Sequence, residues 1–564
     1  MTTRDEAIAQ LTGPGGPFEL KVQEIRGKKM KAYAVRPFTL ADVLRDSRSR
    51  GDLDYLVYEG ERYTLEQNYR LAAGLARELI EGYGISPGDR VAIALRNYPE
   101  FVTLFWAVTA IGAVLVPLNA WWTADELRYG IEDSECVLLA VDRERLESLQ
   151  PILPELTRLR GVISIRVDGE VDGVRRYADL RARFAPDAEL PEVAIDTDDD
   201  ATILYTSGTT GRSRGAVHTH RNHCTNLLNM LLSRSAAALE HGTPAGGRPA
   251  GQPASLANMP FFHISQQSSI YLAAATGTKL VLMYKWDPEV GLDLIERERV
   301  TGFGGVPMQI NGVLDSPTLE RRDLSSLQSF GFAATTAPPE RVKRVQSVFG
   351  GRVSAGTGYG MTEATSAVTS IGGQEYWDHP DSVGKPTPVN EIKIVDDNGN
   401  AVPVGETGEL WVRGPNIVRG YHNKPEDTAR AFSDGWHHSG DVARLDADGR
   451  VYLVDRIKDV VIRAGENVYC GEVEAALYDH PAVHTAAVIG LPHPVFGEEV
   501  VAVVRLREGT AASAGELQAH VGTKLAPFKV PTTIIFITED VPRTATGKVL
   551  KRDLREAMRQ RVAR

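Results

Sequence analysis

The sequence predicts a large α/β body followed by a smaller α+β unit. Up to about residue 380, helical and extended hydrophobic patterns alternate, which is typical of strands paired with helices in an α/β architecture. From about Asp381 to Asp455 the pattern changes to short β segments separated by glycine turns, as at 396–399. Beyond Arg456 the pattern is that of a compact α+β unit. No internal repeat is visible.

The first elements show how this prediction is made. Thr64 and Gln67 have the spacing of a capping box, and leucines recur at helical spacing over 71–79. Gly84 is expected to end this helix, because glycine readily adopts the left-handed backbone conformation that closes helices. The apolar run 91–95 then predicts a buried strand.

The stretch from Phe101 to Thr123 contains no charged residue and is long enough to cross a bilayer. It also contains Gly112, Pro117 and Asn119, and its second half resembles a buried strand. We therefore expect a helix, a glycine turn and a strand inside a core, and no membrane span.

The C-terminal unit is expected to contain a helix near 471–480, strands near Ala486 and Val500, and a helix near 515–525. The glycine-, proline- and alanine-rich stretch 241–255 is expected to be a mobile surface loop.

Composition excludes several classes of protein. The 564 residues exceed one ordinary domain, and the net charge of −11 argues against a nucleic-acid partner. Cys136, Cys224 and Cys470 are far apart without metal-ligand spacing, which fits a reducing compartment. The N-terminus carries Asp5 and Glu6 without an apolar core, so we expect no signal peptide and a cytoplasmic protein.

The segment Tyr205–Gly211 is the most informative of the chain. It gathers glycines and hydroxyls directly after the apolar strand 201–204, where backbone N–H groups and side-chain hydroxyls can surround phosphates. It is not a Walker A loop, because Gly211 is followed by 212–215 (Arg-Ser-Arg-Gly) instead of lysine and a hydroxyl residue.

Five motifs in a fixed order resemble the adenylate-forming superfamily, which holds acyl- and aryl-CoA synthetases, peptide-synthetase adenylation domains and firefly luciferase. The resemblance extends from about residue 60 to 552 and rests on Thr206–Gly215, Gly358–Glu363, Ser439–Asp441, Asp455–Asp459 and Pro542–Lys548.

The resemblance implies a large adenylation domain over 1–457, with two β-sheet subdomains over 1–380 and a small β-barrel over 381–457. A small mobile lid would follow over 458–564, with the hinge at Lys458. The implied reaction joins a carboxylate to AMP with release of pyrophosphate and then transfers the acyl group to coenzyme A.

The resemblance also implies roles for individual residues. Glu363 is the expected Mg²⁺ ligand, and Lys548, Thr362, Glu363 and His263 are the expected catalytic residues. The residues expected to bind ATP or AMP are Thr206, Ser207, Gly208, Thr209, Thr210, Gly211, Arg214, Gly358, Tyr359, Thr362, Asp441 and Arg456. Ser213 and Arg214 replace the usual Pro-Lys of the family, and the arginine keeps the positive charge.

A hydrophobic acid is the expected substrate. His263 stands where amino-acid-activating relatives carry an aspartate, and a buried ammonium without a carboxylate would be costly. The expected acyl pocket comprises His263, Phe303, Gly304, Gly305, Val306, Phe332 and Thr335. Thr335 replaces a glycine common in the family, which could narrow the channel. Fatty, aromatic and bulky terpenoid or steroid-like acids all remain open.

The second half-reaction is assigned by resemblance to Lys458, Ala464, Gly465 and Glu466, which contact coenzyme A or form the hinge. Cys470 replaces a family proline, and a buried inert thiol is its expected state. The basic segment 543–564 is expected to be a solvated helix, with coenzyme phosphate contact as the alternative.

Three other functions are weighed against the ligase. An acyl-AMP ligase that loads a carrier protein is the first alternative, and a luciferase-like oxygenase is more distant. An ATP-binding scaffold without chemistry would lack Lys548, Glu363 or Asp441, and all three are present.

Overall fold

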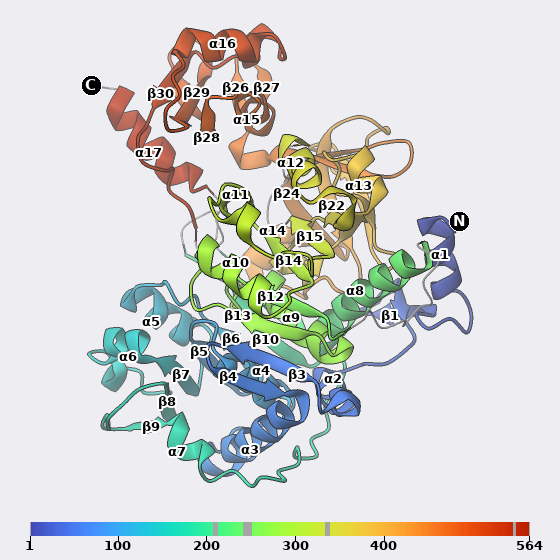
Figure 1. The fold of residues 1–564 in the computed structure, drawn as a ribbon, viewed down its shortest axis with the longest axis vertical. Coiled ribbons are helices and arrows are strands. Elements are labelled where there is room, and N and C mark those ends of the chain that lie inside the picture. The colour runs from blue at the N-terminus through green and yellow to red at the C-terminus, as the bar shows by residue number, and fades with distance from the viewer. Residues whose placement is uncertain (1, 207–211, 241–250, 333–338, 545–548, 563–564) are drawn as a thin grey trace.

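The computed structural model describes the chain except residues 1, 207–211, 241–250, 333–338, 545–548 and 563–564. Two large sheets form the N-terminal body (Figure 1). The first has seven strands in the order β11 (Arg214–Thr219), β10 (Asp200–Thr206), β6 (Val114–Pro117), β5 (Arg90–Ala94), β7 (Leu138–Asp142), β8 (Gly161–Ile165) and β9 (Val174–Arg176).

The second sheet has nine strands, and most of its neighbouring strands are parallel. Their order is β20 (Lys385–Pro386), β19 (Thr369–Gly372), β16 (Ser354–Thr357), β15 (Ser329–Phe332), β14 (Gly302–Gly305), β12 (Ala254–Ala257), β13 (Lys279–Leu282), β3 (Asp54–Tyr58) and β4 (Glu61–Thr64).

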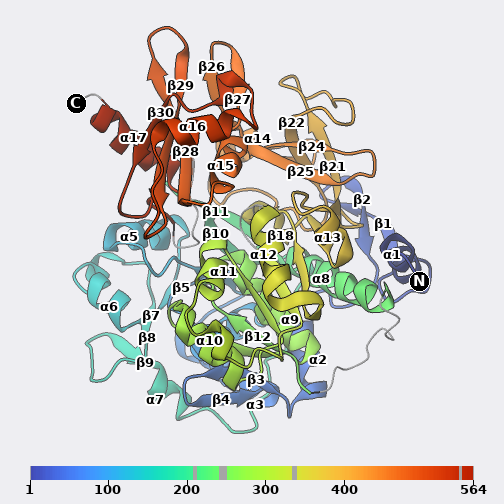
Figure 2. The ribbon, with the colours of Figure 1, turned by 45° about the horizontal axis from the view of Figure 1, so that its top comes forward.

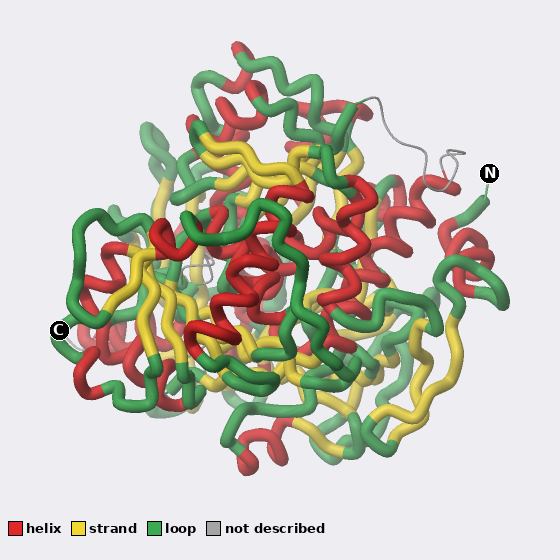
Figure 3. Tube along the Cα trace, turned by 90° about the horizontal axis from the view of Figure 1, so that it is seen from below, coloured by secondary structure: helices red, strands yellow, loops and turns green. Residues whose placement is uncertain are grey.

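Helices cover both faces of each sheet, so that the main core lies between the two sheets. Figure 3 shows helices in the centre of the view with strands on either side. The central core is built on α2 (Leu40–Ser47), α3 (Leu65–Tyr83), α4 (Pro99–Thr109), α8 (His220–Glu240) and α9 (Ile264–Thr276). The outer face of the seven-stranded sheet packs on α5 (Ala124–Asp133) and α6 (Arg143–Leu149). The outer face of the nine-stranded sheet packs on α10 (Pro288–Arg297), α11 (Pro307–Leu314) and α12 (Pro339–Phe349).

The local predictions for this body are confirmed. Thr64 and Gln67 form the capping box of α3, and Gly84 closes that helix with φ of 63°. The uncharged stretch 101–123 contains most of α4, Gly112 with φ of 71°, and the buried strand β6. In the described part of the chain, no helix is both long and apolar enough to span a bilayer.

Residues 381–457, for which the resemblance implies a small β-barrel, form a five-stranded antiparallel sheet whose two ends do not pair with each other. Its strands are β21 (Glu391–Val395), β22 (Gly408–Arg413), β24 (Trp436–Leu445), β23 (Phe432–Ser433) and β25 (Val451–Arg456). The short helix α14 (Pro425–Ala431) precedes β23.

The C-terminal part of the chain is a separate α+β lobe, at the top of Figures 1 and 2, beside α12. Its five-stranded sheet contains β26 (Val461–Arg463), β27 (Glu466–Val468), β28 (Val483–His493), β29 (Gly497–Leu506) and β30 (Thr533–Phe536). One face packs on α15 (Cys470–Tyr478) and α16 (Ala514–Gly522), the other on α17 (Lys551–Val562). The predicted α/β body and smaller α+β unit are thus confirmed. The predicted hinge, Lys458, lies in the 3₁₀ turn Ile457–Asp459 between the last two sheets.

The remaining elements are peripheral or short. These are α1 (Arg4–Thr12), β1 (Leu20–Ile25), β2 (Lys28–Tyr33), α7 (Tyr177–Arg181), α13 (Gln374–Asp378), β17 (Gly360–Met361) and β18 (Ser366–Ala367).

Candidate active site

Asp441 lies at the centre of the predicted ribose site. Strands β24 and β25 pair so that Asp441 is opposite Arg456, and the Arg456 Nε lies 3.0 Å from an Asp441 carboxylate oxygen. The Tyr359 hydroxyl donates a 2.6 Å hydrogen bond to the other oxygen. Burial, and then the nearby Asp441 carboxylate, raise the pKa of Tyr359 well above its usual value. Three motifs that are distant in sequence therefore meet at one carboxylate.

Glu363 lies on the short 3₁₀ turn Thr362–Ala364 that follows β17. The Tyr421 hydroxyl donates a 2.7 Å hydrogen bond to Oε1 of Glu363. Burial, followed by the charge of Glu363, raises the pKa of Tyr421, so the hydroxyl keeps its proton. The backbone carbonyl of Glu363 accepts the Val418 N–H at 2.9 Å. The carboxylate is therefore held in place by the segment that precedes α14.

The chain around this turn is tightly confined. A Cβ added at Gly360 would lie 1.7 Å from the Ser366 carbonyl oxygen, so only glycine fits there. Thr365 and Ser366 adopt positive φ values of 49° and 81°, a conformation that costs free energy for residues with side chains. Asn416 compensates, because its amide donates to the Ala364 carbonyl at 2.8 Å.

The site fits a hard cation such as Mg²⁺. No described residue donates to the second carboxylate oxygen of Glu363, Oε2, which leaves it available for a ligand. Among the described residues, no group of three or more His, Cys, Asp or Glu side chains could hold a metal ion by itself. Magnesium commonly takes one or two carboxylates and completes its shell with phosphate oxygens and water. The single carboxylate of Glu363 fits this kind of coordination.

The strands β10 and β11 flank the predicted phosphate loop, and β11 contacts the Thr362–Ala364 turn. Thr206 ends β10 and Arg214 begins β11, and the two residues are paired in the antiparallel register. The Arg214 guanidinium lies over the Tyr421 ring at 4.4 Å and 3.6 Å from the Asp427 carboxylate. The loop residues Ser207, Gly208, Thr209, Thr210 and Gly211 lie outside the described residues.

His263 caps the N-terminus of α9, where its Nδ1 lies 2.8 Å from the Ser265 hydroxyl. Burial lowers the pKa of His263 to about 4, so the imidazole is neutral at pH 7. Gln266 is engaged locally, with its Oε1 accepting the Met259 N–H at 3.2 Å. The described hydrogen bonds of the His263 ring are both to Ser265, one to its hydroxyl and one to its backbone N–H.

The strands expected to line the acyl pocket present two different faces. The rings of Phe303 and Phe332 lie in the core shared with α10, α11 and α12, and Phe303 stacks on Trp286. Gly304 and Gly331 are paired on the opposite face, toward the central core, and both are partly exposed. On that inner face Gly304 and Gly331 carry no side chain, so the strand backbone itself would border an acyl group there.

Two other predicted pocket residues, Gly305 and Val306, lie at the junction of β14 and α11. Val306 is buried at the start of α11, and a Cβ at Gly305 would meet the Gln309 side chain at 2.8 Å. Gly305 therefore closes the strand against α11. Thr335 lies outside the described residues.

The predicted coenzyme A loop is the tight hairpin turn between β26 and β27. Ala464 and Gly465 both have positive φ, 54° and 88°, as a type I′ hairpin turn requires. Glu466 starts β27 and is exposed. Gly465 therefore has a structural reason to be glycine in addition to the predicted approach of the coenzyme.

The hinge turn is held by the C-terminal lobe. The Cys470 thiol donates to the Asp459 carbonyl at 3.0 Å, and burial raises the pKa of this thiol, as expected of an inert buried cysteine. From α17, Arg555 pairs with Asp459 at 3.2 Å. Lys551 pairs with Glu474 at 2.8 Å, so two cations of the basic tail have internal partners. Lys548 lies outside the described residues.

Three residues that support the site could not be recognised from the sequence. Tyr421, Asn416 and His218 belong to none of the motifs, yet each contacts the Thr362–Ala364 turn or its side chains. The Nε2 of His218, on β11, lies 2.8 Å from the Thr362 carbonyl oxygen. Such contacts join residues that are far apart in sequence, and only the folded chain reveals them.

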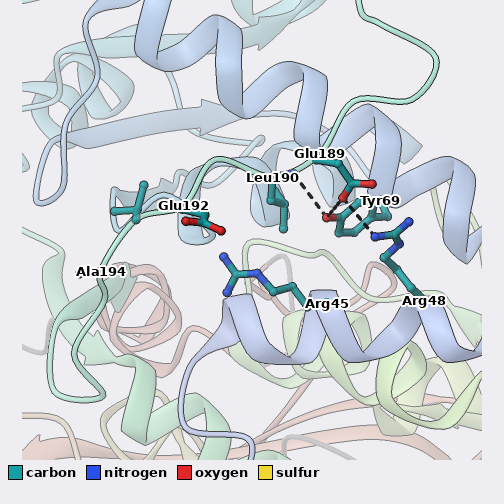
Figure 4. Close-up of a pocket in the computed structure, with 8 residues that line it drawn as sticks. Arg45, Arg48, Tyr69, Glu189, Leu190, Glu192 and Ala194 are labelled. Carbon is teal, nitrogen blue, oxygen red and sulfur yellow. Dashed lines mark hydrogen bonds and ion pairs between the residues drawn. The ribbon is translucent and has the colours of Figure 1, made fainter.

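A pocket of about 720 Å³ lies away from these motifs, at the end of α2 (Figure 4). The Tyr69 hydroxyl donates to Glu189 at 2.8 Å, and Arg48 pairs with the same carboxylate at 3.1 Å. These contacts fasten the segment between α7 and β10 to α3 and to the turn that follows α2, and they account for the polar groups on that side of the pocket.

Comparison with known proteins agrees with this site. Residues 44–422 match the family model described as AMP-binding enzyme, and residues 472–548 match that of the AMP-binding enzyme C-terminal domain. A feruloyl-CoA synthase of an Amycolatopsis species is 35% identical over 497 residues, which cover 88% of this chain and 94% of that protein. A long-chain-fatty-acid–CoA ligase of Bacillus subtilis is 31% identical, covering 92% of this chain and 94% of that protein.

A solved structure of the anthranilate CoA ligase AuaEII, in complex with anthranoyl-AMP, superposes with a TM-score of 0.83 at 26% identity, covering 94% of this chain and 99% of that one. The two family models match residues 44–422 and 472–548, and the feruloyl-CoA synthase match covers 88% of the chain. The chain therefore belongs to the AMP-binding enzyme family, the adenylate-forming superfamily, within its class of AMP-forming acid–CoA ligases.

Proposed function

We propose that this protein activates a hydrophobic carboxylic acid with ATP and transfers the acyl group to coenzyme A. The convergence of Tyr359, Asp441 and Arg456 carries this proposal, because it forms a buried anionic acceptor where three motifs of the adenylate-forming superfamily meet. An ionised carboxylate accepts hydrogen bonds only, which suits the two hydroxyls of a ribose.

In the first half-reaction, a carboxylate oxygen of the acid attacks the α-phosphorus of ATP and pyrophosphate leaves. Both reactants are anions, so the main tasks are alignment and charge stabilisation. Asp441 would orient the ribose, and Arg214 would attract the outer phosphates. Glu363 and the phosphate oxygens would hold Mg²⁺, which supplies positive charge to the phosphates when bound. Lys548 would stabilise the charge where the carboxylate meets the α-phosphate.

In the second half-reaction, the thiol sulfur of coenzyme A attacks the acyl carbonyl carbon and AMP leaves. The C-terminal lobe would rotate about Lys458, which would withdraw Lys548 and present the loop 463–467. The connection at 457–459 supports this, because a single short turn joins the lobe to β25.

The acid itself is proposed only as a class: a fatty, aromatic or bulky terpenoid or steroid-like carboxylic acid. A neutral His263 without a neighbouring carboxylate supports an uncharged acyl group. Relatives named for ferulate and for long-chain fatty acids are consistent with this range.

The test is release of pyrophosphate from ATP with Mg²⁺ across a panel of carboxylic acids, with and without coenzyme A. Sustained turnover that requires coenzyme A and peaks for one class of acid is the expected result. A single burst that coenzyme A does not relieve would indicate a carrier protein as the acceptor. Absence of pyrophosphate release with every acid would contradict the proposal.

A further inference from the structure

We propose that Tyr421 and His218 are positioning residues that tie the expected metal ligand, Glu363, to the strand that follows the phosphate loop. This inference rests on the proposed function and adds to it a physical link between two parts of the nucleotide site. Neither residue belongs to the motifs that predicted the site.

The link begins at β11. After Arg214 this strand continues through Gly215 and Ala216, and the segment around Tyr421 pairs with it. The Val217 N–H donates to the Gly420 carbonyl at 3.1 Å, and the His422 N–H donates to the Gly215 carbonyl at 2.8 Å. Tyr421 is thereby fixed relative to the end of the phosphate loop by backbone hydrogen bonds on both of its sides.

Tyr421 then makes two contacts of different kinds. Its hydroxyl donates to Glu363 Oε1 at 2.7 Å, and its ring lies beneath the Arg214 guanidinium at 4.4 Å. A hydrogen bond to a charged acceptor and a cation–π contact are both directional, so they constrain the ring from its edge and its face. One buried side chain thus contacts both the expected phosphate-binding cation and the expected metal ligand.

His218 provides a second contact from the same strand. Its Nε2 lies 2.8 Å from the Thr362 carbonyl oxygen, which can only accept, so Nε2 is the donor. The imidazole is fully buried, and the residue that it contacts begins the turn that carries Glu363.

The turn needs such support because of its own backbone. Thr365 and Ser366 are both in the left-handed region, so the segment is not in its intrinsically preferred conformation. A side-chain carboxylate on a strained turn keeps its orientation only if the surroundings fix it. The clamp engages Oε1 of Glu363, and no described residue donates to Oε2, the oxygen that a cation contacting the phosphates would take.

The experiment measures binding of a non-hydrolysable ATP analogue by calorimetry, with Mg²⁺ and with EDTA, in the full-length protein. Tyr421→Phe removes one hydroxyl and keeps the ring under Arg214. We expect the magnesium-dependent affinity to fall about tenfold, the size of one charge-assisted hydrogen bond, with little change in EDTA. His218→Leu should act in the same direction, and His218→Gln, which can still donate, should restore part of the affinity.

Tyr284→Phe is the matched control. The Tyr284 hydroxyl donates to Glu144 Oε1 at 2.7 Å, and Arg96 lies over its ring at 5.4 Å, outside the proposed site. This variant should bind the analogue within twofold of the wild type in both conditions.

Three outcomes are distinguishable. A wild-type protein that shows no magnesium-dependent nucleotide binding would overturn the proposed function together with this inference. Normal binding by the wild type and unchanged magnesium dependence in Tyr421→Phe would overturn the clamp alone. Equal losses with Mg²⁺ and with EDTA would also overturn it, since they would show a general effect on the nucleotide pocket.

Discussion

Replacement of Asp441 by alanine should weaken ATP binding far more than it weakens the fold. In the proposed complex, Asp441 accepts two ribose hydroxyls, and each hydrogen bond to a charged group contributes about 1.5–3 kcal/mol. Their loss predicts a rise in the dissociation constant of ATP of about 10²–10⁴, because about 1.4 kcal/mol corresponds to a tenfold change.

The cost to stability is smaller and comes from the partners that remain. The Tyr359 hydroxyl is buried and would lose its 2.6 Å acceptor, which costs about 1–3 kcal/mol. The Arg456 side chain is 39% exposed, so water replaces its lost ion pair at little cost. Calorimetry of ATP binding and urea unfolding of the same variant separate the two effects.

Tyr359→Phe separates the two effects, because it removes the donor to Asp441 but keeps both the carboxylate and the aromatic ring that is expected to contact the nucleotide. It should lose a similar amount of stability but bind ATP within about threefold of the wild type. If Tyr359→Phe weakens ATP binding as much as Asp441→Ala does, Asp441 acts through the fold and the ribose assignment is wrong.

The remaining predictions address other parts of the chain. Lys548→Ala should lower adenylation about 10²–10³-fold and spare thioester formation from supplied acyl-adenylate; equal loss of both half-reactions would refute its role. Gly360→Ala should strongly reduce the yield of folded protein, since its Cβ would lie 1.7 Å from the Ser366 carbonyl oxygen; a normal melting temperature would contradict this. Burial lowers the pKa of His220 from 6.5 to about 4, and its Nδ1 accepts the Leu40 N–H at 3.1 Å. The neutral imidazole therefore stabilises the fold above pH 6.5, and this contribution should be lost as the pH falls toward 4. In urea unfolding, the free energy of unfolding should fall by up to about 3 kcal/mol more for the wild type than for His220→Gln over this pH range. An equal fall in both proteins would count against this role of His220.

Much of the fold could be predicted from local pattern. The capping box at Thr64, the glycine stop at Gly84 and the strand after Gly112 are all decided by residues within a few positions of one another. Hydrophobic periodicity and backbone preference act over the same short range, so they can be recognised without the tertiary structure. The order of the strands across the two large sheets could not be obtained in this way.

The candidate site could also be predicted only in part from the sequence. Asp441, Glu363 and Arg214 were predicted from the sequence, because the motifs that contain them resemble those of the adenylate-forming superfamily. They did not indicate that Phe303 and Phe332 turn toward the outer core, since alternation along a strand defines two faces without saying which one borders the ligand.

The sequence by itself determined the α/β body, the α+β lobe, the superfamily and the residues expected to bind the nucleotide. The tertiary structure alone decided how those residues are held: Tyr359 and Arg456 on Asp441, and Tyr421 on Glu363. Glu363 and Tyr421 are 58 positions apart, and Tyr359 and Asp441 are 82 apart. Contacts over such separations form only when sheet pairing brings distant segments together, so no local pattern can encode them.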